Sequence, residues 1–233
     1  MPAVAQRMAD EGPRRYRHRS MTRLRKSSRI FNDPGARESV KQAMLAPGPN
    51  LFEIDPQAIF GRRAPLEIEL GAGKGEFIIE RARECPDRDF LAVELSAVIA
   101  NLLSVRCGRT GLTNLRVVRM DARTLVNLML SGASVRAFHI YFPDPWPKER
   151  HVKHRLFTPY FAGSLIRTLE PDGSAFIATD VSAYAEEIFP MMQGAGFVRA
   201  AEPPPGALMT GFGRKYAAAG KPAYAASFRA AKG

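Results

Sequence analysis

Cysteine and long apolar stretches are both scarce in this sequence, and each shortage excludes a class of protein. Only two cysteines occur among the 233 residues, which excludes a small disulfide-held fold and is typical of a reducing compartment. No apolar run reaches the length of about eighteen residues that a membrane-spanning helix needs. The histidines and cysteines also lack the spacing of zinc ligands. We therefore predict a cytoplasmic protein that uses neither a membrane nor a metal.

Acidic residues are few relative to basic ones. Lysine and arginine number 34 against 23 aspartates and glutamates, which gives a net charge of +11 and an isoelectric point near 10.1. A protein this basic usually meets a polyanion such as a nucleic acid. The alternative is a basic surface that serves only solubility. We predict a nucleic acid as the partner.

The basic residues crowd the beginning of the chain. Residues 7–29 are rich in arginine and hold few large apolar side chains, so they cannot bury enough surface to fold by themselves. We predict a flexible basic arm over residues 1–35 and a folded domain over residues 36–233. The arm either contacts RNA or is a solvated terminus without a specific role.

Strand-like and helix-like segments alternate through the predicted domain. Such alternation predicts an α/β fold with a mostly parallel sheet and helices on both faces. Ligands of such sheets bind at the carboxyl ends of the strands. Seven strands are expected, at residues 66–70, 89–95, 114–120, 135–142, 173–180, 197–202 and 223–230. Helices are expected at residues 36–45, 75–85, 97–109, 122–130, 159–170 and 182–196, the last one bent or broken at Pro190.

A glycine-rich segment, ELGAGKGEF, follows the first predicted strand. Gly71, Gly73 and Gly75 allow the backbone to turn sharply and to approach a ligand closely. Glu76 stands where the dinucleotide-binding fingerprint requires glycine or alanine, and Lys74 is not followed by the serine or threonine of a P-loop. A phosphate-rich ligand is therefore disfavoured, and a purely structural turn is the alternative to a ligand cradle.

Acidic residues mark the ends of the first five predicted strands. Glu94 lies where an acid would bind both hydroxyls of a ribose, and Asp121 lies where it would accept from an adenine amino group. S-adenosylmethionine suits such a cleft, because it combines adenine, ribose and a cationic centre without phosphate. The alternative is that acids cap the following helices, with Ser96 and Asp121 as N-caps. The five acids are Glu69, Glu94, Asp121, Asp144 and Asp180.

Five segments of the chain, in their order, resemble the bacterial tRNA (guanine-N7)-methyltransferases: EIELGAGKGEF, AVEL, RMDA, YFPDPWPKERHVKHR and ATD. The resemblance covers roughly residues 50–215, and PDPWPK is its most specific part. It implies a Rossmann-like class I methyltransferase fold, S-adenosylmethionine as the cofactor, and methylation of N7 of a guanine in the variable loop of tRNA. It leaves open whether the protein is a monomer or a homodimer.

The resemblance also implies roles for individual residues. Cofactor contacts are expected from Glu69, Gly71, Gly73, Glu94, Asp121 and Asp144. Substrate contacts are expected from Lys148, Asp180 and Thr210, and RNA contacts from Arg150, His151, Lys153, His154 and Arg155.

Two positions depart from the family's pattern. His154 stands where a lysine or arginine is frequent. Thr210 keeps the start of a T-x-x-E signature, but Gly213 stands where its glutamate is expected. Either another acid such as Glu202 replaces that glutamate, or guanine recognition is weaker or different.

The segment FHIYFPDPWPKERHVKHR, residues 138–155, is expected to carry the chemistry. Two prolines fix the backbone on either side of Asp144 and stiffen the loop. Guanine N7 has a free lone pair, so no base is needed, and a fixed carboxylate can follow the positive charge that moves onto the guanine. We predict Asp144 as the catalytic residue and Asp180 as the partner of the guanine N–H edge. Trp146 is expected to pack the loop, with stacking on a base as the alternative, and His139 to be a core residue.

Three other functions stay open on the sequence alone. Gly213 leaves room for a methyltransferase that acts on another RNA or on a small molecule. The basic arm would also suit a non-catalytic RNA-binding protein that keeps the fold. A nicotinamide-dependent oxidoreductase is disfavoured by Glu76, which interrupts the dinucleotide fingerprint.

Overall fold

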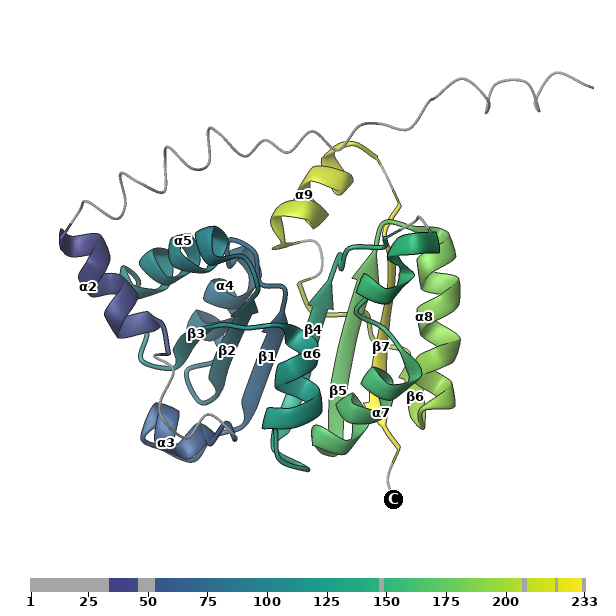
Figure 1. The fold of residues 1–233 in the computed structure, drawn as a ribbon, viewed down its shortest axis with the longest axis horizontal. Helices are drawn as coiled ribbons and strands as arrows, with labels where there is room; N and C mark the ends of the chain where they lie inside the picture. The colour runs from purple at the N-terminus through teal and green to yellow at the C-terminus, as the bar shows by residue number, and fades with distance from the viewer. Residues whose placement is uncertain (1–33, 46–52, 147–148, 207–208, 221, 232–233) are drawn as a thin grey trace, which may run out of the picture.

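In the computed structural model, which describes residues 34–45, 53–146, 149–206, 209–220 and 222–231, a seven-stranded sheet forms the centre of the molecule (Figure 1). The strands lie in the order β3-β2-β1-β4-β5-β7-β6, and all neighbours pair in parallel except β7, which is antiparallel to β5 and β6. The predicted mostly parallel sheet is confirmed. The strands are β1 (Leu66–Leu70), β2 (Asp89–Glu94), β3 (Leu115–Arg119), β4 (Val135–Tyr141), β5 (Leu169–Thr179), β6 (Phe197–Ala200) and β7 (Tyr224–Ala230).

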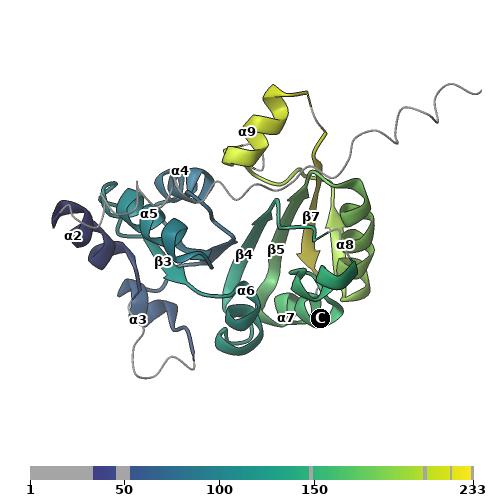
Figure 2. The same ribbon diagram turned by 45° about the horizontal axis from the view of Figure 1, so that its top comes forward.

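Helices cover both faces of the sheet (Figures 1 and 2). One face packs against α2 (Pro34–Ala43), α4 (Glu76–Glu84) and α5 (Ala97–Gly108). The other face packs against the π-helical η2 (Leu125–Met129), α7 (Pro159–Thr168) and α8 (Ser182–Gly194). Shorter elements are α3 (Pro56–Phe60), α6 (Ala122–Thr124) and the 3-10 helix η3 (Glu149–His154), and α9 (Gly211–Ala218) lies beyond the carboxyl ends of the strands.

The central strand β1 shows how the sheet is buried on both faces. Every residue of β1 is buried. Ile68 joins the apolar core that lies against η2, α7 and α8. The opposite face, toward α4, receives Glu67 and Glu69, which contact Arg81 and the first turn of that helix. Parallel strands covered on both faces are usually apolar at nearly every position, so these two glutamates are exceptions.

The structure differs from the prediction at β5 and at Pro190 of α8. β5 begins at Leu169 rather than at residue 173, because Leu169 already pairs with Val135 ahead of a register shift. The helix α8 continues through Pro190, so a break there, one of the two predicted outcomes, does not occur. Pro190 and Glu186, whose carbonyl loses its intrahelical hydrogen bond, are both exposed, and water can take the place of that bond.

The predicted basic arm falls almost wholly outside the described residues, because the description starts at residue 34. Residues 34 and 35, which the prediction assigned to the arm, already belong to α2. α2 packs on α5, where the backbone of Ser39 lies against Gly108. No helix in the described part of the chain is long and apolar enough to cross a membrane.

Candidate active site

The carboxyl ends of β1 and β4 form the centre of the candidate site. β1 pairs with β2 on one side and with β4 on the other. The chain runs outward from β1 to β3 and then returns to begin β4, so the direction of strand order reverses between β1 and β4. Ligands of open α/β sheets bind in the crevice at such a reversal. The loop after β1 and the loop after β4 therefore border the expected ligand crevice.

The loop after β1 is built on glycines in the left-handed region. Gly71, Gly73 and Gly75 have φ values of 82°, 56° and 74°. A side chain at Gly75 would collide with Leu103, so the loop packs tightly against α5 at this point. The space beside Gly71 is open, with no atom within 4 Å of the position a Cβ would take. The loop is thus anchored at its end and open at its beginning, where a ligand could reach the backbone.

Glu94, at the end of β2, holds this glycine loop in place. Its Oε2 accepts the N–H of Gly73 at 3.1 Å, and its Oε1 accepts the N–H of Ser96 at 2.8 Å. Burial raises the pKa of Glu94, these backbone donors lower it, and the Asp144 carboxylate raises it further. The structure therefore brings Glu94 and Asp144, which lie fifty positions apart in the chain, within electrostatic reach of each other.

Glu69 lies beneath the glycine loop and is only 3% exposed. Burial raises the pKa of its carboxyl well above the usual range, although the N–H of Ile78 in the first turn of α4 lowers it. Its Oε2 has no hydrogen-bond partner among the described residues. Gly75, the capping residue of α4, has no side chain to bond that first turn, so Glu69 supports the start of the helix instead.

Asp121 acts as the N-cap of α6, which was the alternative to a cofactor contact. Its side chain accepts the backbone N–H groups of Arg123 and Thr124 at 2.8 and 3.2 Å. Burial raises the pKa of Asp121, but the hydrogen bonds and positive charge of Arg123 and the backbone N–H of Thr124 together outweigh burial and lower the pKa. Ser96, by contrast, caps α5 without a side-chain hydrogen bond. The capping role thus applies to one of the two predicted N-caps.

The loop after β4 holds Asp144 in an unusual backbone. Phe142 and Trp146, on either side of the aspartate, have φ values of 54° and 42°, a region that bulky side chains rarely adopt. Each such residue costs about 1–3 kcal/mol and persists only when its surroundings enforce it. The N–H of Phe142 donates to the carbonyl of Ala178 on β5 at 2.7 Å. Strain and anchoring together present Asp144 as an exposed carboxylate.

Arg155 enforces this loop conformation from the far side. Its Nε donates to the carbonyl of Pro145 at 3.0 Å, and its guanidinium pairs with Glu187 and lies 5.5 Å from the centre of the Tyr184 ring. Arg155 was predicted to contact RNA, which stays a prediction, and the structure shows that its guanidinium also has partners within the protein. The side chain therefore positions the Asp144 loop.

Trp146 packs against the histidines of η3. Its ring lies 5.6 Å from that of His151 and 5.2 Å from that of His154. This is the packing role that was favoured over base stacking. Arg150, Lys153 and His154 are exposed on η3, whereas Lys148 lies outside the described residues.

The predicted substrate residues lie around the start of α9 and the end of β5. Asp180 is half-buried directly after β5, the neighbour of β4. Thr210 precedes α9, and its Oγ1 accepts the N–H of Gly213 at 2.9 Å. Thr210 therefore serves as a cap.

Glu202 was named as one acid that could replace the glutamate missing at position 213. That side chain pairs with Arg229 at 3.4 Å, on β7. The start of α9 instead faces Glu76, whose Oε1 lies 3.4 Å from the position a Cβ would take at Gly211. Glu76 thus places a carboxylate next to α9. In the sequence analysis this residue only interrupted the dinucleotide-binding fingerprint.

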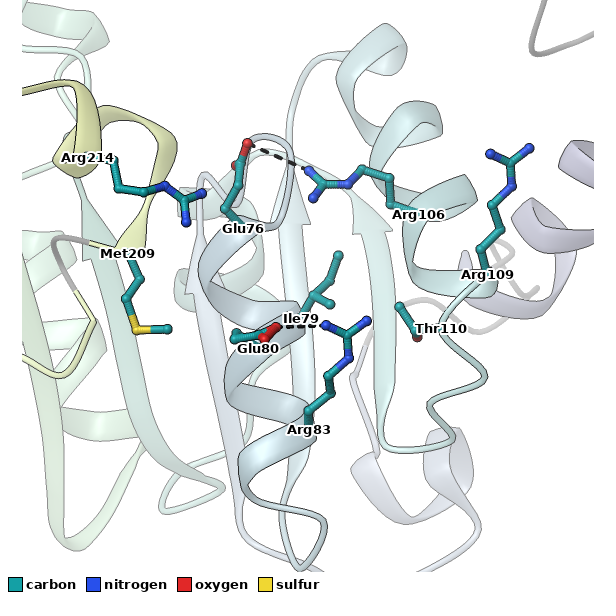
Figure 3. A pocket seen from close by; sticks show the side chains of 9 residues that line it. All are labelled: Glu76, Ile79, Glu80, Arg83, Arg106, Arg109, Thr110, Met209 and Arg214. Atoms are coloured by element: carbon teal, nitrogen blue, oxygen red, sulfur yellow. Dashed lines mark hydrogen bonds and ion pairs between the residues drawn. The ribbon is translucent and has the colours of Figure 1, made fainter.

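An arginine-lined groove, defined by the residues drawn in Figure 3, adjoins the glycine loop along α4 and α5. Its volume is about 640 Å³. Arg83 pairs with Glu80 at 2.7 Å, and Arg106 lies 3.7 Å from Glu76. Arg214 extends from α9 toward Glu76 on α4 (Figure 3). The lining residues are Glu76, Ile79, Glu80, Arg83, Arg106, Arg109, Thr110, Met209 and Arg214.

Comparison with known proteins identifies the family. Residues 63–226 match the model of a family described as "Putative methyltransferase". The chain belongs to this methyltransferase family. A relative from Nitrosomonas eutropha, named tRNA (guanine-N(7)-)-methyltransferase, is 46% identical over 132 residues, which is 57% of this chain and 59% of the relative. A relative of the same name from Nitrosomonas europaea is 41% identical over 140 residues, which is 60% of this chain and 62% of the relative. The matched region thus spans about three fifths of these relatives.

Solved structures of methyltransferases share the fold of this family member. The 16S rRNA methyltransferase KamB matches with a TM-score of 0.56 and 17% identity, over 75% of this chain and 91% of its own. A SAM-dependent methyltransferase from Aquifex aeolicus matches with a TM-score of 0.51 and 14% identity, over 88% of this chain and 98% of its own. The predicted Rossmann-like class I fold is confirmed.

Sequence reasoning missed a buried polar cluster beneath the crevice of this methyltransferase-family protein. Glu67 accepts hydrogen bonds from Arg81 and Arg88 and contacts His139 Nε2 at 2.9 Å. His139 Nδ1 in turn lies 3.0 Å from the hydroxyl of Tyr141. The prediction of His139 as a core residue is confirmed, because it is fully buried. The alternation of acidic and apolar residues in LEIEL was the available signal for buried ion pairs on one face.

Removal of the Arg155 side chain should loosen the Asp144 loop in this family member. We expect Arg155→Ala to lower the free energy of unfolding by about 1.5–3 kcal/mol, because hydrogen bonds to a charged group are lost. Trp146 is the chain's single tryptophan, so acrylamide quenching of its fluorescence reports on the loop directly and should increase. Arg199→Ala is the matched control, because Arg199 lies 5.2 Å from the centre of the Phe189 ring without touching the loop. Equal quenching in both variants would contradict the positioning role.

Proposed function

We propose that the protein is a tRNA (guanine-N7)-methyltransferase that transfers a methyl group from S-adenosylmethionine to N7 of a guanine in the variable loop of tRNA. The observation that carries this proposal is the electrostatic coupling of two carboxylates, Glu94 and Asp144, beside an open glycine loop. Membership of a methyltransferase family and the names of the relatives support it. Its expected compartment is the cytoplasm.

The residues at the crevice fit S-adenosylmethionine. Burial, the largest cause, and the Asp144 carboxylate both raise the pKa of Glu94. A cationic ligand would relieve this repulsion. Each Glu94 oxygen accepts one backbone N–H and has a further lone pair, which suits ribose hydroxyls. Glu69 would contact the cofactor through Oε2, which has no hydrogen-bond partner among the described residues. Asp121, which already caps α6, would contribute a second carboxylate.

The chemistry needs positioning and a fixed negative charge. When bound, S-adenosylmethionine supplies an electrophilic methyl group on a positively charged sulfur. Guanine N7 attacks with its free lone pair, so no residue has to remove a proton. Asp144, held in its strained loop, stabilises the positive charge that develops on the guanine. We assign Asp180 as the acceptor for the N–H edge of the guanine. Thr210 and Lys148 are assigned to orient the guanine.

We propose that two basic surfaces bind the phosphate backbone of the RNA. The first is η3, where Arg150, Lys153 and His154 are exposed beside the Asp144 loop. The second is the arginine-lined groove, which starts at the glycine loop because Arg106 donates to the carbonyl of Lys74. A guanine held at Asp144 would leave its flanking nucleotides near both surfaces. Phosphate contacts from such residues position a nucleic acid without reading its sequence.

Methyl transfer to undermodified tRNA tests the proposed function. Purified protein is incubated with labelled S-adenosylmethionine, and chemical cleavage at 7-methylguanine locates the product. We expect label at a guanine of the variable loop. Label on another nucleotide or on a small molecule would replace the proposed substrate, and binding of tRNA without any transfer would indicate a non-catalytic RNA-binding protein.

Neutralisation of Asp144 tests the proposed catalytic role. We expect Asp144→Asn to lower kcat by about 10²–10³-fold at saturating tRNA, the usual effect of losing one preorganised electrostatic contact in an active site. Asp87→Asn is the control. Asp87 is an exposed acid in the turn before β2, at the amino ends of the strands and so opposite the crevice. An unchanged kcat in Asp144→Asn would remove Asp144 from the chemistry.

Removal of one proposed phosphate contact should change the salt dependence of binding. We expect Lys153→Ala to weaken tRNA binding and to reduce the slope of log K against log salt by about 0.7–0.9, one phosphate contact. Arg63→Ala is the control, because Arg63 is exposed next to α3 and bonds Gln57 at 2.9 Å, away from η3. Fluorescence anisotropy with labelled tRNA between 50 and 200 mM salt, roughly the range over which such contacts are resolved, provides the slopes. Identical slopes in wild type and Lys153→Ala would take Lys153 out of the interface.

A further inference from the structure

A continuous series of polar contacts leads from the buried Glu67 to the segment that precedes α9. Glu67 Oε2 lies 2.9 Å from His139 Nε2, and His139 Nδ1 lies 3.0 Å from the Tyr141 hydroxyl. The same hydroxyl donates to the carbonyl of Pro205 at 2.6 Å. Both ends of the series are acceptors, a carboxylate and a carbonyl, so the number of protons available decides which contacts are hydrogen bonds.

The carboxylate end of the series determines the tautomer of His139. Burial raises the pKa of Glu67, but hydrogen bonds from His139 and Arg88 outweigh it and hold the pKa at about 2. Glu67 is therefore ionised and can only accept, which places a proton on Nε2 of His139. Burial lowers the pKa of His139, against the effect of Glu67, so the ring is neutral at neutral pH and its Nδ1 is an acceptor.

Tyr141 consequently has one proton and two acceptors. Its hydroxyl can donate to the Pro205 carbonyl or to Nδ1 of His139, but not to both at once. The carbonyl is the closer acceptor, at 2.6 Å against 3.0 Å. When the proton serves one acceptor, the other loses its donor from Tyr141: either Nδ1 of the fully buried His139 or the carbonyl of the half-buried Pro205. This loss opposes a complete commitment to either bond.

The Pro205 carbonyl belongs to a turn that is seated on the same aromatic cluster. Gly206 has φ +70°, and a Cβ there would lie 2.5 Å from Cδ2 of Phe77. The Phe77 ring lies 4.7 Å from that of His139 and 5.1 Å from that of Tyr141. The carbonyl of Gly206 accepts the N–H of Met209 at 2.8 Å, and Thr210 follows directly.

We propose that Tyr141 is a positioning residue whose single hydroxyl proton divides between Pro205 and His139, and that its bond to Pro205 holds the turn at residues 203–206 in the place that positions Met209 and Thr210 ahead of α9. The consequence for catalysis rests on the proposed function, in which Thr210 contacts the guanine. The competition for the proton is independent of that function.

Two substitutions should have different effects on hydrogen exchange near Met209 and Thr210. Tyr141→Phe removes the donor, so the turn loses its attachment, and hydrogen exchange of peptides that cover Met209 and Thr210 should become about tenfold faster. His139→Phe keeps a ring against Phe77 and removes the competing acceptor, so exchange there should slow or stay unchanged. Tyr184→Phe, which removes a buried hydroxyl on α8, is the control and should leave this region unaffected. Faster exchange in both the Tyr141 and His139 variants would overturn the proposal.

The ¹⁵N shifts of the His139 ring provide a test in the unmodified protein, should the His139 variant fail to fold. We expect the neutral Nε2–H tautomer at pH 7.5, and finding the Nδ1–H tautomer or a charged ring there would overturn the competition.

Kinetics test the consequence for the proposed function. Tyr141→Phe should raise KM for tRNA about tenfold with little change in the affinity for S-adenosylmethionine, because the crevice residues Glu94 and Asp144 are untouched. An unchanged KM together with faster exchange would refute the link from the turn to substrate binding. Absence of methyl transfer in the wild-type protein would count against the proposed function alone, because hydrogen exchange and the ring shifts require no substrate.

Discussion

The pairing of β1 with β2 on one side and β4 on the other is the constraint on which the rest of the structure depends. It aligns the carboxyl ends of three strands whose following loops are far apart in sequence. The glycine loop, Glu94 and Asp144 meet because of this alignment, and the reversal of strand order leaves the crevice between them. Every role proposed for the site depends on how the carboxyl ends of these strands are aligned.

Two buried carboxyl groups on β1 show two solutions to one physical problem, since an isolated buried charge is too costly to keep. Glu67 remains ionised because Arg81, Arg88 and His139 surround it. For Glu69, burial raises the pKa well above the usual range, which favours its protonated form. The ionised group fixes the tautomer of the histidine beneath the crevice, whereas the protonated one supports the first turn of α4 without adding charge to it.

Charge is distributed in opposite senses at the centre and the periphery of the site. Carboxylates occupy the crevice, and arginines and lysines occupy η3 and the arginine-lined groove beside it. A cation is attracted to the first region and a polyanion to the second. This arrangement suits a reaction between a cationic methyl donor and an RNA, and it explains why a protein with a net charge of +11 has an acidic cleft.

The sequence by itself determined the sheet, most of its helices, the glycine loop and the acids at the strand ends, because these features follow from local periodicity and from residue types at strand boundaries, whereas α3 and α9 were not predicted. It also indicated the stiff loop around Asp144, since proline acts on its own backbone. Only the tertiary structure decided that Arg155 anchors that loop, that Glu76 and not Glu202 faces α9, and that Tyr141 reaches Pro205. Each of these contacts joins residues from different elements, and their side-chain directions depend on packing between those elements rather than on local sequence.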